Sequence, residues 1–231
     1  MPCQELNAPA TMNLVRDGAM RIGAGLTRRA LAALDTALAD LPPERAGIRI
    51  TGMRDLDPYL RGVGEIGAIA GAVLGDAARP VRAILFDKTP HTNWRLGWHQ
   101  DRTIAVRARV ETPGYGPWSM KGGLQHVAPP FDVLDGMVTL RVHLDPAGSE
   151  NAPLLVAPGS HRLGVVPQAR IATAVASCGQ FACLAEPGDV WVYATPILHA
   201  SHAAASPTRR RVLQVDYAAR DLPGRLEWLG V

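Results

Sequence analysis

Trp94-Arg-Leu-Gly-Trp-His-Gln-Asp101 is the stretch around which the rest of this sequence is organised. Its aromatic and branched residues suit a β-strand, and it places a histidine and a carboxylate two residues apart. Residues two apart in a strand point to the same face, with their Cα atoms roughly 6.5 Å apart. His99 and Asp101 could therefore bind one divalent metal ion together. An open catalytic iron site of this type needs one more histidine, which completes the two-histidine, one-carboxylate facial triad.

A candidate third ligand lies about a hundred residues later, in Ile197-Leu-His-Ala-Ser201. His199 and His202 both follow a strand-like run, so both are candidates for this position. The other histidines have simpler explanations. His143 alternates within a strand pattern and can fill the core, whereas His161 follows Pro-Gly-Ser in a turn, where it can cap or support other groups.

The composition is that of an ordinary globular protein of one domain, residues 1–231. The net charge of +3 and a longest basic tract of three arginines give no support for nucleic-acid binding. No apolar run approaches the ~18 residues of a membrane span. The three cysteines, Cys3, Cys178 and Cys183, form an odd number without a Cys-x-x-Cys motif, and the N-terminal residues do not resemble a secretory signal. These features predict free thiols and a cytoplasmic protein.

The first part of the chain predicts helices around a core. Residues 1–12 form a loose N-terminal arm in this interpretation. Thr27 is the expected N-cap of a helix over 28–39, with Leu31, Leu34 and Leu38 on one face. A second helical region is predicted over 58–74, and a short helix over 168–177.

The second part predicts many short strands separated by Gly/Pro turns, which is typical of a sandwich or barrel rather than an alternating α/β fold. The expected strands cover 47–50, 81–86, 94–101, 137–144, 153–157, 180–184, 189–193 and 211–217. Residues 112–133 are rich in Gly and Pro and predict a long loop without regular structure. Such loops are often functional, so this one is a candidate substrate lid; a rigid surface connection is the alternative.

Arg209-Arg210-Arg211 leads into the last predicted strand. An iron site with open positions usually binds an anionic co-substrate, and the planar guanidinium of arginine suits the far carboxylate of a dicarboxylate. Alternation along a strand places Arg210 on the face opposite to its two neighbours. The alternative is a solvated basic edge that discourages strand pairing.

Taken together, four motifs in this order resemble the phytanoyl-CoA dioxygenase family of iron(II)- and 2-oxoglutarate-dependent oxygenases. The motifs are Trp98-His-Gln-Asp101, Val156-Ala-Pro-Gly-Ser-His161, Leu198-His-Ala-Ser201 and Arg209-Arg-Arg-Val-Leu213, and the resemblance extends from about Asp17 to Tyr217. Two departures are visible. The usual Glu-Asn-Gly reads Glu150-Asn-Ala here, and His-Gly-Ser reads His-Ala-Ser, followed by a second histidine at 202.

The resemblance implies a mainly β fold, the double-stranded β-helix (a jelly-roll, cupin-like fold), with helices packed on one sheet. It implies that His99, Asp101 and His199 bind iron. In the family the co-substrate arginine lies eleven residues past the distal histidine, which selects Arg210 when His199 is the ligand but Leu213 when His202 is. The same pattern places Ser201 on a 2-oxoglutarate carboxylate, and by similarity Gln100, Lys88 and Trp118 are further co-substrate contacts.

The chemistry implied is the consumption of 2-oxoglutarate and O2 with release of succinate and CO2. The expected outcome is hydroxylation of an unactivated C–H bond in a small molecule, such as an amino acid, a natural-product intermediate or an acyl compound. Asp101 disfavours halogenation, because related halogenases replace this carboxylate. Two alternatives stay open: a cupin-like metalloenzyme that does not use 2-oxoglutarate, and a non-catalytic metal-binding protein.

Overall fold

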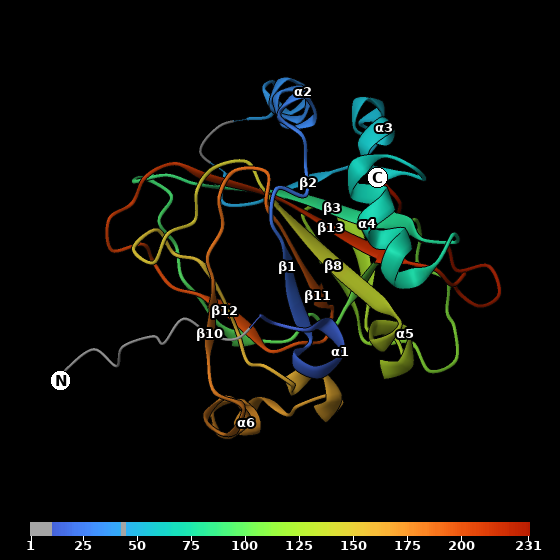
Figure 1. Ribbon diagram of the computed structural model, residues 1–231. Coiled ribbons are helices and arrows are strands. Elements are labelled where there is room, and N and C mark those ends of the chain that lie inside the picture. Colours follow the sequence, from blue (N-terminus) through green and yellow to red (C-terminus); the bar gives the residue numbers. More distant parts are fainter. Residues whose placement is uncertain (1–10, 43–44) are drawn as a thin grey trace.

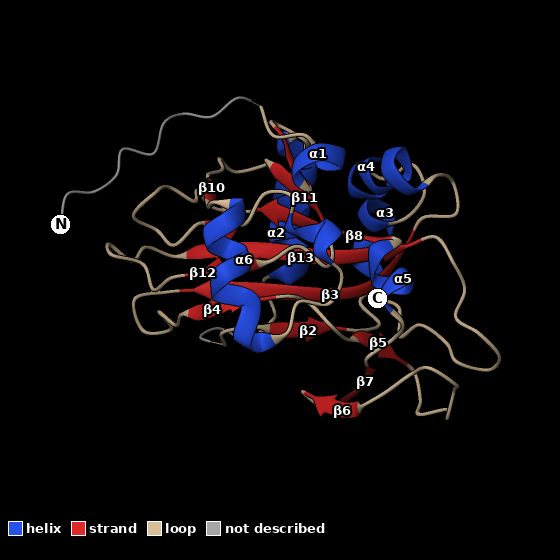
Figure 2. Cartoon of the chain, turned by 90° about the horizontal axis from the view of Figure 1, so that it is seen from below, coloured by secondary structure: helices blue, strands red, loops and turns tan. Residues whose placement is uncertain are grey.

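The structure is a computed structural model that describes residues 11–42 and 45–231. Most of the predicted N-terminal arm therefore lies outside the described residues. Two antiparallel sheets form the body of the molecule (Figure 1), with strand orders β1-β11-β8-β13-β3-β2 and β10-β9-β12-β4. A smaller sheet, β5-β7-β6, lies beyond β2 (Figure 2). The mainly β, double-stranded β-helix prediction is confirmed.

The strands have the following bounds. They are β1 (Ala19–Ile22), β2 (Ile48–Ile50), β3 (Arg79–Lys88), β4 (Leu96–His99), β5 (Ile104–Val106), β6 (Trp118–Lys121), β7 (Leu124–Val127), β8 (Met137–His143), β9 (Leu154–Val156), β10 (Phe181–Cys183), β11 (Val190–Ala194), β12 (His199–Ser201) and β13 (Arg210–Ala218). The helices are α1 (Leu14–Asp17), α2 (Arg28–Leu38), α3 (Asp57–Leu60), α4 (Glu65–Leu74), α5 (Phe131–Asp135) and α6 (Ile171–Cys178), with 3-10 turns over Arg54–Leu56, Ser160–Leu163 and Gln168–Arg170.

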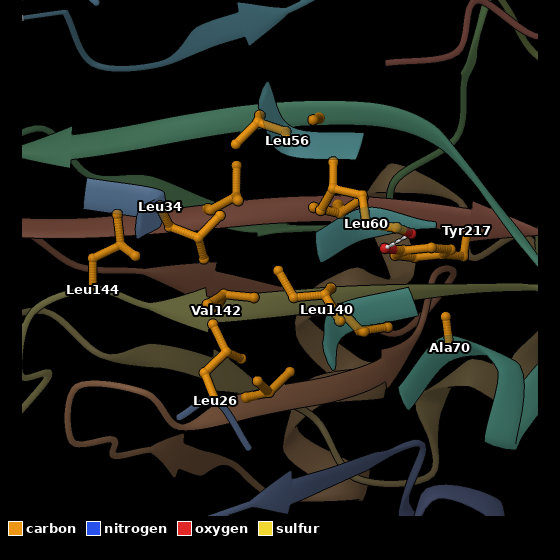
Figure 3. Packing of buried hydrophobic residues seen from close by; sticks show 14 of the residues in the cluster. Leu26, Leu34, Leu56, Leu60, Ala70, Leu140, Val142, Leu144 and Tyr217 are labelled. Atoms are coloured by element: carbon orange, nitrogen blue, oxygen red, sulfur yellow. Dashed lines mark hydrogen bonds between the residues drawn. The ribbon is translucent and has the colours of Figure 1, made fainter. Parts of the chain in front are cut away.

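Helices α2, α3 and α4 cover the outer face of the six-stranded sheet (Figure 1). Helix α2 begins where predicted, because the Thr27 hydroxyl accepts a hydrogen bond from the Ala30 amide. Figure 3 shows Leu34 of this helix among the leucines and valines of the core between helices and sheet. Leu34 is fully buried, and burial of such a side chain stabilises the fold by ~1.5–3 kcal/mol.

The predicted helical region over 58–74 is two helices, not one. A Cβ atom on Gly64 would lie 2.2 Å from the carbonyl oxygen of Pro58, so the chain can pass this point only with glycine. Gly62 also has a left-handed backbone, with φ +52°. The apolar periodicity continues from α3 to α4 across residues 61–64, so the sequence pattern alone predicted a single helical region.

The predicted loop over 112–133 is also partly wrong. Strands β6 and β7 form a hairpin within it, and β7 pairs with β5. The hairpin turns at Gly122 and Gly123, which have φ angles of +58° and +80°. Whether this segment moves as a lid stays a prediction.

Strand β13 separates polar from apolar residues by simple alternation. Leu213, Val215 and Tyr217 pack into the core under the helices, and the Tyr217 hydroxyl donates to the carbonyl of Leu60 at 2.8 Å (Figure 3). Arg210 and Asp216 are buried on the opposite face. The inner face of this sheet is therefore unusually rich in charged groups.

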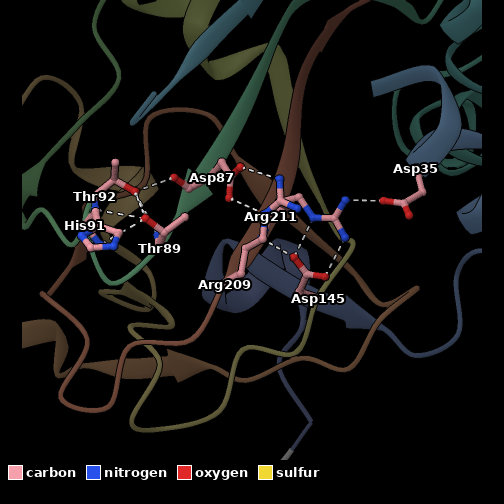
Figure 4. A network of polar contacts seen from close by, with 8 residues as sticks. All are labelled: Asp35, Asp87, Thr89, His91, Thr92, Asp145, Arg209 and Arg211. Atoms are coloured by element: carbon pink, nitrogen blue, oxygen red, sulfur yellow. Dashed lines mark hydrogen bonds and ion pairs between the residues drawn. The ribbon is translucent and has the colours of Figure 1, made fainter. Parts of the chain in front are cut away.

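The two arginines that flank Arg210 are held by acidic partners (Figure 4). Arg209 pairs with Asp87 at 2.9 Å, and Arg211 pairs with Asp145 at 2.8 Å and with Asp35. Because β13 lies inside the sheet between β8 and β3, the alternative of a solvated basic edge is wrong.

None of the helices in the described part of the chain is long and apolar enough to cross a membrane. Cys178 and Cys183 are free thiols. The cytoplasmic location stays a prediction.

Candidate functional site

His99, Asp101 and His199 come together on the smaller of the two main sheets. Strands β4 and β12 are antiparallel neighbours, with His99 directly opposite His199 and the two rings 4.3 Å apart. The predicted strand over 94–101 ends at His99, so Asp101 lies just beyond it rather than on it. One ligand atom from each of the three residues still lies within 4.8 Å of the others.

Both imidazoles have one ring nitrogen occupied by a backbone contact. Nδ1 of His99 lies 2.8 Å from the carbonyl oxygen of Gly97, and Nδ1 of His199 lies 3.0 Å from that of Ile197. In the tautomer that donates to these carbonyls, Nε2 keeps its lone pair for a ligand. Burial, reinforced by the neighbouring His99, lowers the pKa of His199 to about 4. His199 is therefore neutral near pH 7, as a metal ligand must be.

Arg82 of β3 holds the third candidate ligand. Its Nη2 donates to Asp101 at 3.0 Å, while its Nε donates to Asp216 at 2.5 Å. Burial alone would raise the pKa of Asp101, but the charge of Arg82 and the two imidazoles outweigh it and lower the pKa to about 2. Asp216, which shares Arg82, has a raised pKa because burial dominates there. Asp101 is thus ionised and oriented.

Two imidazoles and one ionised carboxylate fit a divalent metal of the facial-triad type. The choice of His199 over His202 also agrees with the geometry. His202 is exposed and its side chain belongs to a different depression, whereas His199 is buried beside His99.

The triad lies in a pocket of about 430 Å³ between the two main sheets. Charge is distributed very unevenly in this pocket. Asp101 is the single carboxylate among its described lining residues, whereas seven lining residues are basic: Arg49, Arg82, Lys88, Arg102, Lys121, Arg141 and Arg210. A pocket of this kind favours anionic ligands.

Arg210 and Lys88 are cross-strand neighbours in this pocket. Arg210 is only 1% exposed, and its Nε and Nη1 atoms have no hydrogen-bond partner. Burial, together with the charge of Arg141, lowers the pKa of Arg210 to about 9. A buried guanidinium without a partner is costly, and a carboxylate would supply the missing acceptors.

Lys88 completes this basic part of the pocket. Its Nζ donates to the Ser201 hydroxyl at 3.1 Å and to the His202 carbonyl at 2.8 Å, and it lies 4.9 Å from the centre of the Trp94 ring. Burial, and then the charges of Arg210 and Arg141, lower the pKa of Lys88 to about 8. Ser201 therefore lies where it was predicted, in the same pocket as Arg210.

Gln100 lines the pocket, but its amide is fully engaged elsewhere. Its Nε2 donates to the carbonyls of Gly164 and Pro196 at 2.9 and 2.8 Å, and its Oε1 accepts from the Val166 amide at 2.9 Å. These bonds fix the backbone between the two ligands His99 and Asp101. Gln100 thus positions the ligand strand rather than offering a free group to a co-substrate.

Trp118 does not belong to this site. It packs with an apolar cluster under β5 and β7 and stacks against Arg109 at 5.5 Å, outside the lining of the pocket. The structure therefore does not place Trp118 among the co-substrate contacts that the resemblance implied. Trp94, within the quoted motif region, is the tryptophan that lines the pocket.

Comparison with known proteins gives a consistent result. The sequence model of the family described as Phytanoyl-CoA dioxygenase (PhyH) matches residues 14–212. Among curated proteins, none matches this sequence.

Solved structures share the fold at low identity. AviO1 from Streptomyces viridochromogenes Tue57 matches with a TM-score of 0.63 and 22% identity over 91% of this chain and 94% of AviO1. EctD from S. alaskensis in its apoform matches with a TM-score of 0.62 and 19% identity over 94% of this chain and 78% of EctD. EctD has also been crystallised with Fe, and with 2-oxoglutarate and 5-hydroxyectoine. SnoN, a non-heme alpha ketoglutarate-dependent epimerase from nogalamycin biosynthesis, matches with a TM-score of 0.60 and 15% identity over 92% of this chain and 87% of SnoN.

Proposed function

The chain belongs to the phytanoyl-CoA dioxygenase family of iron(II)- and 2-oxoglutarate-dependent oxygenases, and from this premise we propose that it hydroxylates an unactivated C–H bond of a small molecule. In this reaction 2-oxoglutarate and O2 are consumed and succinate and CO2 are released, with one oxygen atom in succinate and the other in the product. His99, Asp101 and His199 hold iron(II), and Arg210 holds the far carboxylate of 2-oxoglutarate.

One observation carries the proposal. The pocket that contains the facial-triad ligand set also contains a buried guanidinium whose Nε and Nη1 have no partner. A dicarboxylate that reaches from the metal to a cation needs both features in one pocket. Neither a metalloenzyme without 2-oxoglutarate nor a protein that only binds metal requires this combination.

The residues of the chain have separate tasks in this proposal. Arg82 keeps the Asp101 carboxylate oriented, and the carbonyls of Gly97 and Ile197 fix the tautomers of the two histidines. Lys88 and Ser201 assist Arg210 at the far carboxylate. Bound iron(II) would supply O2 activation. The protein contributes orientation and a pocket that excludes bulk water.

Substrate classes that fit the family are amino acids, natural-product intermediates and acyl compounds. The oxidative outcome is the finer part of the proposal. SnoN, which has the same fold, is an epimerase, so the product of the reaction has to be identified chemically and not only by 2-oxoglutarate consumption.

The test is production of succinate from 2-oxoglutarate by the purified protein with iron(II), ascorbate and air. We expect turnover with the wild type and none with Asp101→Ala. Asp221→Ala is the matched control, because Asp221 is 94% exposed and lies outside the pocket. Succinate production retained in Asp101→Ala would contradict the assignment. Metal bound without any 2-oxoglutarate turnover, with or without candidate substrates, would favour the alternatives.

A further inference from the structure

Two of the seven basic residues that line the pocket are unexplained after these assignments. Arg210 and Lys88 face the co-substrate, Arg82 is paired with Asp101 and Asp216, and Arg102 donates to the carbonyl of Val166. Arg141 donates to Gln214 at 3.0 Å and stacks against Phe86; its Nε has no partner among the described residues, but its charge lowers the pKa values of Arg210 and Lys88, so it belongs to the co-substrate side of the pocket. Arg49 and Lys121 remain.

Arg49 points into the pocket because of strand alternation. It lies opposite Ile84 on β3, whereas its neighbours Ile48 and Ile50 lie opposite Leu85 and Ala83 of the helix-covered core. Its Nε atom is buried and has no hydrogen-bond partner. No carboxylate among the described residues forms an ion pair with it.

Lys121 reaches the same part of the pocket from the β6–β7 hairpin. Its Nζ donates to the Thr103 hydroxyl at 2.8 Å, and Thr103 lies two residues beyond the ligand Asp101. The Arg49 guanidinium lies against the turn that follows Lys121, since a Cβ atom on Gly122 would be 3.0 Å from Nη1 of Arg49. β2 and the hairpin therefore bring Arg49 and Lys121 into the lining of the pocket that also contains the triad.

The electrostatics agree with this geometry. Burial lowers the pKa of Arg49, and the charge of Arg82 lowers it further. Burial also lowers the pKa of Lys121; Asp101 opposes this effect, and Arg82 and Arg49 add to it. Arg49 and Lys121 repel each other, and among the described residues neither forms an ion pair with a carboxylate, so an anion bound between them would be stabilised by both.

We propose that Arg49 and Lys121 form a second anion subsite, which binds a carboxylate or phosphate group of the substrate while Arg210 holds the co-substrate. The substrate is then an organic acid or a phosphate ester, and its anionic group is bound on the hairpin side of the pocket. This inference rests on the proposed function, because it takes Arg210 and Lys88 to be occupied by 2-oxoglutarate.

The experiment measures anion binding by isothermal titration calorimetry to the full chain, loaded anaerobically with Mn(II) and saturated with 2-oxoglutarate. The probes are benzoate and phenyl phosphate, with neutral benzamide as their counterpart. We expect at least one of the two anions to bind to the wild type and benzamide to bind much more weakly. A preference for benzoate indicates a carboxylic acid substrate, and a preference for phenyl phosphate indicates a phosphate ester.

Arg49→Gln/Lys121→Gln should weaken anion binding by about tenfold or more, while the Kd for 2-oxoglutarate changes little. The matched control is Arg28→Gln/Arg29→Gln, which removes the same charge from exposed positions on α2 and should keep wild-type affinity. Arg49→Lys/Lys121→Arg, which keeps both positive charges, should retain anion binding. This result would show that Arg49→Gln/Lys121→Gln loses binding because the charges are removed and not because the protein misfolds.

Absence of anion binding to the 2-oxoglutarate-saturated wild type, or equal binding to Arg49→Gln/Lys121→Gln, would overturn the inference. The proposed function fails separately, through absence of succinate production. Second-anion binding that depends on Arg49 and Lys121 would still be measurable in that case.

Discussion

Replacement of Arg210 by methionine should stabilise the ligand-free protein while it abolishes co-substrate binding. The guanidinium is 1% exposed, and two of its nitrogens have no partner. Its pKa is lowered from the ordinary 12.5 to about 9, chiefly by burial and then by Arg141. Because each pKa unit is worth about 1.4 kcal/mol, keeping the charged form in this environment costs roughly 5 kcal/mol.

The gain in the free energy of unfolding of Arg210→Met should be smaller than this cost. Water in the pocket already solvates part of the Arg210 charge, and methionine is smaller than arginine and does not fill the space completely. Replacement of a buried ion pair by well-packed apolar side chains is often neutral or gains ~1–4 kcal/mol, and Arg210 has no carboxylate partner among the described residues whose loss would offset the gain. For a chain of this length, each kcal/mol shifts Tm by about 2–4 °C. We therefore expect Tm of metal-free Arg210→Met to lie roughly 3–10 °C above that of the wild type.

The assay is thermal unfolding followed by circular dichroism, in a buffer without phosphate or carboxylates, since these anions could occupy the site. A second series adds Mn(II) and 2-oxoglutarate. At a 2-oxoglutarate concentration of 100 Kd, the wild type should gain about 2.7 kcal/mol, and Arg210→Met should gain almost nothing.

Arg209→Met and Arg211→Met are the matched controls. These arginines have carboxylate partners outside the pocket (Figure 4), so their loss should lower Tm, because it leaves Asp87 or Asp145 without its partner, and should keep the 2-oxoglutarate response intact. The reasoning is refuted if Arg210→Met unfolds at a lower temperature than the wild type, or if it keeps the response to 2-oxoglutarate.

Three further predictions follow from the geometry. His199→Ala should lose iron, measured by metal analysis after anaerobic loading, whereas His202→Ala should keep it; the opposite ranking would move the third ligand to position 202. The pKa of Lys88 is lowered to about 8 by burial, with the charges of Arg210 and Arg141 adding to the effect. Between about pH 8 and pH 10.5, Lys88 is therefore protonated in the unfolded chain but neutral in the folded protein. Below pH 8 the folded protein carries the buried charge, which lowers the free energy of unfolding, and this loss of stability disappears as the pH rises from 8 to 10.5. Lys88→Met should exceed the wild type in Tm at pH 7 by more than at pH 9.5, and a difference independent of pH would contradict this. Ala152 has φ +50°, in the left-handed region that favours glycine; Ala152→Gly, which restores the usual residue of the family, should leave chemical-denaturation stability unchanged or raise it by up to ~1 kcal/mol, and a marked loss would show that the methyl group is needed.

The parts of the site that could be predicted from sequence are those encoded by local pattern. Two-residue alternation predicts that Arg210 faces away from its neighbours, whereas the choice of His199 over His202 came from the resemblance to the family, in which eleven residues separate the distal histidine from the arginine. Asp101 was identified although the strand ends before it, because its carboxylate still reaches the histidines. Local pattern was sufficient for His99, Asp101 and Arg210, and not for His199.

Other parts depend on which distant strands become neighbours. Arg82 and Arg49 lie in runs that look like ordinary strands, and their roles become apparent only when β3 and β2 lie beside the triad. A charged residue alternating with apolar ones in a buried strand was the available signal. The β6–β7 hairpin had a signal as well, since Gly122-Gly123 between two short apolar-polar runs is typical of a tight hairpin turn.

The ion pairs on both sides of Arg210 have a consequence for how this protein can change in evolution. Outside the pocket, Asp87 forms an ion pair with Arg209 and Asp145 forms one with Arg211. A shift of the β13 register by one residue would therefore break both ion pairs. A substitution in β13 changes one side chain and leaves the register intact. A single inserted or deleted residue in β13 would instead move Arg209 or Arg211 to the pocket face of the sheet, where its carboxylate partner is out of reach. We therefore expect related chains to keep the length of β13, and their insertions and deletions to lie outside both β13 and the eleven-residue interval from His199 to Arg210.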